Sequence, residues 1–176
     1  LTVGETFLGP PAGSLLFVAL GTGLVCGWLN GFLVTRFMLP SIVVTIGTFS
    51  LYRGLGSVVL GDKAFTNYPE AMTSWGQGVF FGMVPRSFVI LLGFALLFAL
   101  VLHWTSTGRR IYAIGNNPDA ARFSGIAVDR YRLGLFMLTG AMAGLAAFLL
   151  TGRIDSTRPN IATGWELEII TMVILG

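Results

Sequence analysis

The chain has 176 residues, of which 54% are hydrophobic and only 11% are charged, and its formal net charge is +3. A soluble domain carries about 25% charged residues because its surface must stay in water, so this composition argues against a soluble protein. The small net charge and the lack of a basic run argue against a nucleic-acid-binding protein.

Residues 12–34 form the first long apolar segment and carry no charged side chain. About 20 helical residues cross a bilayer core of roughly 30 Å, so this segment predicts a transmembrane helix. Small residues recur at every fourth position here and in a later segment: Gly23, Gly27 and Gly31, then Gly140 and Gly144. This spacing lets helix backbones approach closely in lipid and predicts a compact bundle.

Residues 41–60 form a second apolar segment, which polar residues and glycines interrupt. It contains Arg53, the hydroxyl side chains of Thr45, Thr48 and Ser50, and Gly47, Gly54 and Gly56. Glycine weakens a helix and arginine is costly at membrane depth, so we expect this helix to be bent or broken. Arg53 then either faces a watery cavity or extends to the headgroups from the last turn.

Residues 87–104 and 133–151 are two further uncharged segments, and another apolar segment begins at residues 166–176. The sequence therefore predicts an all-α, polytopic transmembrane helix bundle with four full spans and a truncated fifth. All 176 residues are expected to belong to one transmembrane domain. Because residue 1 is Leu and the last apolar segment stops at residue 176, we interpret the chain as an internal fragment of a longer protein.

The arginines indicate the orientation of the chain. Residues 105–132 contain five of them, whereas residues 61–86 contain Lys63 and Arg86 as their only basic residues; the five are Arg109, Arg110, Arg122, Arg130 and Arg132. Basic residues concentrate in cytoplasmic loops of membrane proteins. We therefore predict that residues 105–132 are cytoplasmic and residues 61–86 external, although two arginines in the external loop 152–164 oppose the rule.

Within residues 105–132, the order of residue types predicts a short helix. Asn117 suits the N-cap position, Pro118 the first helical position and Asp119 the positive end of the helix dipole, and Gly125 can end the helix in a left-handed conformation. So short a helix is not stable alone in water and needs a surface to pack against. It is either an ordinary turn between two spans or a protruding helix that docks onto a soluble partner.

Several motifs resemble one family of permeases. They are residues 107–117 (TGRRIYAIGNN), 120–126 (AARFSGI), 40–54 (PSIVVTIGTFSLYRG), 29–31 (LNG), 164–167 (GWEL) and 1–4 (LTVG). These are similar to motifs of the permeases of ABC importers for ribose, galactose, xylose and autoinducer-2. Residues 156–159 (STRP), 164–168 (GWELE) and 59–62 (VLGD) look most like the rhamnose permeases of that family.

The resemblance implies a multi-pass subunit of the bacterial inner membrane that translocates a monosaccharide. Its ATPase-coupling residues would be Asn117, Pro118, Asp119, Ala120, Ala121, Arg122, Phe123, Ser124 and Gly125. The implied partners are a cytoplasmic ABC ATPase, a periplasmic sugar-binding protein, a second permease subunit and membrane lipid. ATP and Mg would be bound by the ATPase, and no cofactor is expected in this chain, which has no G-x-x-x-x-G-K-[ST] motif.

A neutral sugar is recognised by hydroxyl and amide groups and by an aromatic face. The candidates for the translocation path are Asn30, Thr45, Thr48, Ser50, Arg53, Trp165 and Glu166. For each of them, a role in helix packing is an equally good interpretation.

Three other classes of protein fit less well. A gradient-driven carrier needs acidic residues within its spans, and the four complete segments contain none. A membrane enzyme needs a set of converging catalytic groups, whereas Cys26 and His103 are the only cysteine and histidine. The same two residues give no ground for a metal site. A structural scaffold would have little need for an arginine in a span.

Overall fold

The structure is a computed structural model that describes residues 12–61, 65–66, 76–80, 84–157, 161 and 163–176. Its helices are α1 (Ala12–Phe37), α2 (Ser41–Leu60), α4 (Arg86–Trp104), α5 (Ser106–Asn116), α6 (Pro118–Phe123), α7 (Val128–Ile154) and α8 (Trp165–Leu175). Among the described residues, α1, α2, α4 and α7 are long and apolar enough to cross a membrane. The prediction of an all-α, polytopic transmembrane bundle is confirmed.

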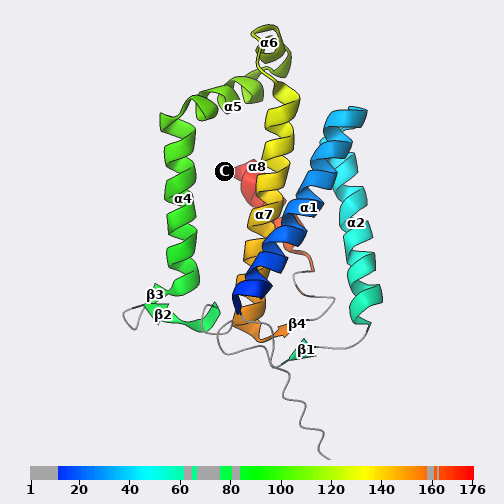
Figure 1. The fold of residues 1–176 in the computed structure, drawn as a ribbon, viewed down its shortest axis with the longest axis vertical. Helices are drawn as coiled ribbons and strands as arrows, with labels where there is room; N and C mark the ends of the chain where they lie inside the picture. Colours follow the sequence, from blue (N-terminus) through cyan, green and yellow to red (C-terminus); the bar gives the residue numbers. More distant parts are fainter. Residues whose placement is uncertain (1–11, 62–64, 67–75, 81–83, 158–160, 162) are drawn as a thin grey trace, which may run out of the picture.

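The long helices stand side by side, with α5 and α6 at one end of the bundle and short strands at the other (Figure 1). At the strand end, β1 (Phe65–Thr66) pairs antiparallel with β4 (Ser156–Thr157), and β2 (Val79–Phe80) pairs antiparallel with β3 (Val84–Pro85). The β1–β4 pair joins two connections that the sequence analysis placed on the same side of the membrane. Lys63 and Arg158, which entered that analysis, lie outside the described residues.

Helices α1 and α7 form the closest pair in the bundle, and the repeated glycines lie at their contact. A Cβ atom added to Gly23 would overlap the carbonyl oxygen of Gly140, and one added to Gly27 would overlap that of Phe136. Without side chains at these positions the two backbones touch directly, which is how helices associate in lipid. The sequence predicted close packing, and the structure shows that the two glycine-bearing helices pack against each other.

Helix α2 runs without interruption from Ser41 to Leu60, so the predicted break is wrong. Its polar side chains bond within the helix: Thr45 Oγ1 donates to the carbonyl of Ser41, and Thr48 Oγ1 to that of Val44. Glycine reduces helix stability by about 1 kcal/mol in water. In lipid, breaking the helix would expose backbone groups with no hydrogen-bond partner, which costs more.

Four helix ends extend beyond the predicted spans because charged residues continue a helix beyond its apolar part. Helix α1 ends at Phe37 instead of residue 34, α4 begins at Arg86 instead of residue 87, and α7 runs from Val128 to Ile154 instead of from residue 133 to 151. The added residues include Arg36, Asp129 and Arg153.

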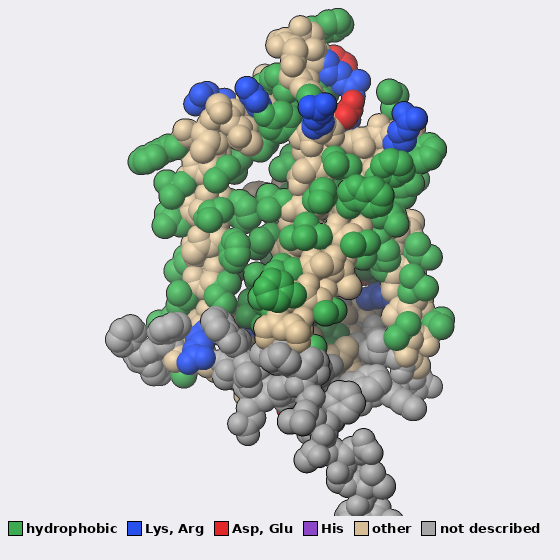
Figure 2. Space-filling model, in the orientation of Figure 1, with side chains coloured by type: hydrophobic (Ala, Val, Ile, Leu, Met, Phe, Trp, Pro, Cys, Tyr) green, Lys and Arg blue, Asp and Glu red, His purple; other side chains and the backbone are tan. Residues whose placement is uncertain are grey.

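Apolar side chains cover the outside of the long helices (Figure 2). Phe17, Val58 and Leu96 are among the exposed large apolar residues, whereas Val34, Val44 and Phe148 are among the few that are buried. A surface of this kind is stable only in lipid. Together with the four spanning helices, it supports the prediction of a multi-pass membrane protein.

Candidate functional site

The connection between α4 and α7 contains a helix, α5, that the sequence analysis did not predict. Thr105 caps it, because its Oγ1 accepts a hydrogen bond from the backbone N–H of Gly108 at 3.2 Å. Gly108 lies directly on the end of α4, where a Cβ atom would overlap the carbonyl of Leu102. This close approach turns the chain sharply, so that α5 crosses the end of the bundle (Figure 1). The Thr105 cap was a signal available in the sequence.

Asn117 separates α5 from α6 and caps the second helix. Its side-chain oxygen accepts hydrogen bonds from the N–H groups of Asp119 and Ala120, both at 3.0 Å. Pro118 occupies the first helical position, and Gly125 has a φ of +80° just after the helix ends. The predicted helix, its Asn117 cap and the left-handed Gly125 after its end are confirmed; the last helical residue is Phe123.

One face of α6 packs against the bundle. Ala121 is only 4% exposed, and its carbonyl oxygen accepts a hydrogen bond from the N–H of Ile126 at 3.1 Å. Arg122 reaches α7, where its guanidinium lies 2.7 Å from the carboxylate of Asp129. Ala121 therefore holds α6 in place and is not available to a partner as part of a docking surface.

The other face of α6 is free among the described residues. The ring of Phe123 is 93% exposed, and Asp119, Ala120 and Ser124 are exposed beside it. Burial of such a ring against a partner surface would be favourable. Helix α6 lies at the end of the molecule opposite to the strands (Figure 1), so the exposed Phe123 belongs to that end.

A small pocket of about 210 Å³ separates α6 from the connection between α1 and α2. Its lining includes Thr35, Met38, Asp119 and Arg122. Met38 has a φ of +52°, a conformation that is uncommon for residues other than glycine. The sharp turn between α1 and α2 thus lies beside α6, and no pattern in the sequence indicated this contact.

Six of the ten arginines gather around α5 and α6. Arg36 lies in the last turn of α1, and the other five lie on α5, α6 and the first turns of α7: Arg109, Arg110, Arg122, Arg130 and Arg132. Figure 2 shows basic side chains along this end, which we call the arginine-rich end. The structure thus places Arg36 at the same end of the bundle as the five arginines from which the cytoplasmic side was predicted. That this end is cytoplasmic stays a prediction.

One residue predicted for a translocation path, Arg53, contacts the segment that leads into α8. Arg53 donates from Nη2 to the Thr163 hydroxyl at 3.2 Å, and its guanidinium lies 4.9 Å from the centre of the Phe49 ring. Glu166 lies close by in sequence and accepts from the N–H of Gly164 at 3.0 Å. The partly exposed Arg53 is therefore held between α2 and the start of α8 rather than extended alone into the headgroups.

The other residues predicted for the translocation path are less well placed to contact a sugar. The hydroxyls of Thr45, Thr48 and Ser50 all donate to carbonyl groups of their own helix. Asn30 lies on α1, where its side-chain oxygen is buried and accepts no hydrogen bond within the described part of the chain. Trp165 opens α8 and is half exposed. Among the described residues, no group of three or more His, Cys, Asp or Glu side chains is placed to hold a metal ion.

Comparison with known proteins gives a family match over almost the entire chain. Residues 7–176 match a family described as branched-chain amino acid transport system / permease component. This agrees with the prediction of a transport component rather than an enzyme.

Individual relatives are identical to the chain at about a third of the aligned residues. It is 36% identical over 165 residues to the autoinducer 2 import system permease protein of Yersinia pestis (strain Pestoides F), covering 94% of the chain and 46% of that protein. It is also 36% identical over 151 residues to the ribose import permease protein of Bacillus subtilis (strain 168), covering 84% of the chain and 46% of that protein. The chain thus spans about half the length of these relatives, and no solved structure gives a significant match.

Proposed function

The chain belongs to the family of branched-chain amino acid transport system / permease components, and we propose that it is part of the membrane-spanning subunit of an ABC importer for a monosaccharide. The family membership and the names of the autoinducer 2 and ribose relatives support this role. Its partners would be a cytoplasmic ATPase, which binds ATP and Mg, a periplasmic sugar-binding protein and a second permease subunit, either identical or a paralogue.

The exposed ring of Phe123 on the capped helix α6 is the observation that carries the proposal. Residues 117–125 would form the coupling helix, and the ring would enter a groove of the ATPase at the arginine-rich end. Aromatic side chains that become fully buried contribute strongly to protein–protein affinity. Ala121 and Arg122 would serve instead to transmit the movement of α6 to α7.

The test uses the full-length permease purified together with its ATPase. We expect Phe123→Ala to weaken ATPase association by at least tenfold, because truncation of such an anchor costs about 2 kcal/mol or more. Phe17→Ala is the matched control, since Phe17 is also exposed but lies near the start of α1, far along that helix from Arg36. Unchanged ATPase association and unchanged sugar-dependent ATP hydrolysis in the Phe123 variant would refute the docking role of α6.

For the translocation path, we propose that the sugar passes close to Arg53 and Glu166, beside Trp165. The support is that the partly exposed guanidinium of Arg53 belongs to the candidate span Ser41–Val59, and basic residues within spans generally have functional roles. Asn30, Thr45, Thr48 and Ser50 remain candidates with weaker support. We expect Arg53→Gln to abolish uptake while ATPase association is preserved, and Ser50→Ala to have little effect. The reverse pattern would place the path on another face of α2.

We propose rhamnose as the sugar, on the resemblance of residues 156–159 and 164–168 to rhamnose permeases. Arg158 and Pro159 lie outside the described residues, as do residues 1–4 and Asp62, so this support rests on sequence. Uptake of labelled rhamnose in a deletion strain, with ribose and autoinducer-2 as competitors, is the direct test. Failure of rhamnose to enter, with uptake of one of the other two, would replace the substrate and leave the importer in place.

A further inference from the structure

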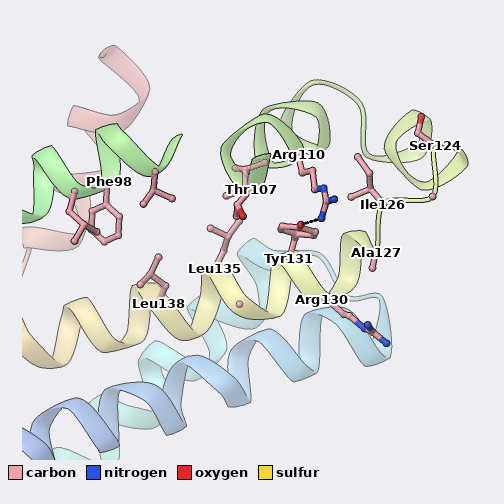
Figure 3. A pocket seen from close by; sticks show the side chains of 15 residues that line it. Phe98, Thr107, Arg110, Ser124, Ile126, Ala127, Arg130, Tyr131, Leu135 and Leu138 are labelled. Carbon is pink, nitrogen blue, oxygen red and sulfur yellow. Dashed lines mark hydrogen bonds between the residues drawn. The ribbon is translucent and has the colours of Figure 1, made fainter. Parts of the chain in front are cut away.

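An open groove of about 860 Å³ lies between α4 and α7, beneath α5. Its walls are apolar: Leu97, Phe98 and Val101 come from α4, and Leu135 and Leu138 from α7. Figure 3 shows the labelled wall residues on both sides of the opening, with α5 above it. The groove therefore has a hydrocarbon-like interior that opens beside the arginine-rich end.

The mouth of the groove is polar and basic. Arg110 on α5 points down into it and donates from Nη1 to the hydroxyl oxygen of Tyr131 on α7 at 2.8 Å (Figure 3). Thr107 adds a hydroxyl group. The backbone of Arg130 adjoins the opening while its side chain is directed away from Tyr131. None of the described lining residues is acidic, so the charge of the Arg110 guanidinium is not neutralised within the groove.

The distance between the Arg110 cation and the far end of the apolar walls suits an amphiphile, which has a charged headgroup and an apolar chain. Tyr131 and Leu138 are seven positions apart on α7, which corresponds to about 10 Å along a helix. A negative group bound to Arg110 would therefore have about 10 Å of apolar wall beneath it. A small soluble anion would leave those walls uncovered, and a purely apolar chain would leave the guanidinium without a counter-charge.

We propose that this groove binds an anionic phospholipid, with its phosphate at Arg110 and Tyr131 and one acyl chain along Leu135 and Leu138. Basic pockets between helices at the cytoplasmic membrane surface suit such headgroups. Helix α5 supports this placement because, unlike the spanning helices, it separates polar and apolar residues onto opposite faces, as helices that lie in the membrane interface do. The proposal concerns a lipid site and is independent of which sugar is carried.

The first experiment measures lipid retention by native mass spectrometry of the full-length permease, extracted from nanodiscs that contain equal amounts of phosphatidylglycerol and phosphatidylcholine. We expect a preference for phosphatidylglycerol that falls about fivefold in Arg110→Gln, since one basic residue contributes about that factor to the binding of anionic lipid. Arg109→Gln is the matched control, because Arg109 is the neighbouring arginine on α5 but does not line the groove. Equal losses in both variants, or no loss in either, would overturn the proposal.

The second experiment locates the occupant. A photo-crosslinking residue in place of Leu138, introduced as Leu138→benzoylphenylalanine, should add the mass of a phospholipid to the permease upon illumination. Crosslinking of this position to another helix, from the same subunit or a second one, would mean that protein fills the groove and would overturn the proposal. Loss of ATPase association in the Phe123 variant bears only on the proposed function, so the two proposals can fail separately.

Discussion

Replacement of a glycine at the α1–α7 contact should separate the two helices, and Gly23→Ala is the sharpest form of this test. A Cβ atom on Gly23 would lie 3.0 Å from the carbonyl carbon of Gly140 and 3.2 Å from the Cα of Gly144, and it would overlap the Gly140 oxygen. Carbon atoms pack best at about 3.5–4.0 Å. The helices would therefore have to move apart by roughly 0.5–1 Å along this contact.

Such overpacking typically costs about 1–3 kcal/mol, which outweighs the gain of roughly 1 kcal/mol in helix propensity that alanine brings. The matched control is Gly21→Ala, on the same helix, where a Cβ atom would meet nothing within 4 Å. The assay is the fraction of full-length permease that remains monodisperse by gel filtration after heating. We expect a lower apparent melting temperature for Gly23→Ala, and an unchanged or higher one for Gly21→Ala.

The partner glycine provides a second comparison. Gly140→Ala should destabilise to a similar extent, because its Cβ atom would overlap the carbonyl oxygen of Gly23. Since both substitutions force the same separation, the double variant should lose less stability than the sum of the two. Equal melting temperatures for Gly21→Ala and Gly23→Ala would refute the reasoning, because the glycines would then not be required for the contact.

Three further predictions concern the arginine-rich end. Asn117→Ala should remove two hydrogen bonds from the start of α6 and destabilise that helix by about 1 kcal/mol, seen as faster amide exchange of Asp119 and Ala120, whereas Asn116→Ala should not. Arg122→Ala should change the free energy of unfolding by less than about 1 kcal/mol, because both partners of its ion pair with Asp129 are about half exposed. The same substitution should reduce the coupling of ATP hydrolysis to transport. The charge-swapped double variant, Arg122→Asp with Asp129→Arg, should restore this coupling. The hydrogen bond to Tyr131 raises the pKa of Arg110 above its ordinary value. The stabilisation that comes from a raised basic pKa is lost only as the pH rises through that pKa, so the melting temperatures of the wild type and Arg110→Gln should differ by the same amount from about pH 5 to pH 9. A difference that changes with pH in this range would contradict this.

The features that the sequence predicted well are those set by neighbouring residues. The ends of α6 follow from Asn117, Pro118 and Gly125, because a cap depends on atoms within three or four positions of the chain. The spans follow from apolar length alone. Helix α5 was not predicted because its polar residues suggested a loop. The Thr105 cap and the mixture of Arg110 with Ile111 and Ile114 are nevertheless typical of an interfacial helix.

The features that the sequence did not predict depend on distant parts of the chain. Glycine spacing marks a face for close packing but does not say which helix meets it, so the pairing of α1 with α7 came only from the structure. The contact of Arg53 with Thr163 joins residues 110 positions apart. The continuity of α2 was misjudged because the cost of glycine was weighed as it is in water, whereas lipid penalises an open helix more strongly.

The packing of the helices suggests how a push on α6 would be distributed through the bundle. Helix α6 is attached to α7 by the Arg122–Asp129 ion pair, and α7 is joined to α1 by direct backbone contact. Close-packed surfaces move together because they have little free volume, so α6, α7 and α1 should move as one body. Helix α4 faces α7 across an open groove, and the described residues connect it to α6 through the turn at Gly108 and the length of α5. The relative movement of the helices is therefore expected at the groove and at the sharp turn at Met38, and an occupant of the groove would limit how far α4 can approach α7.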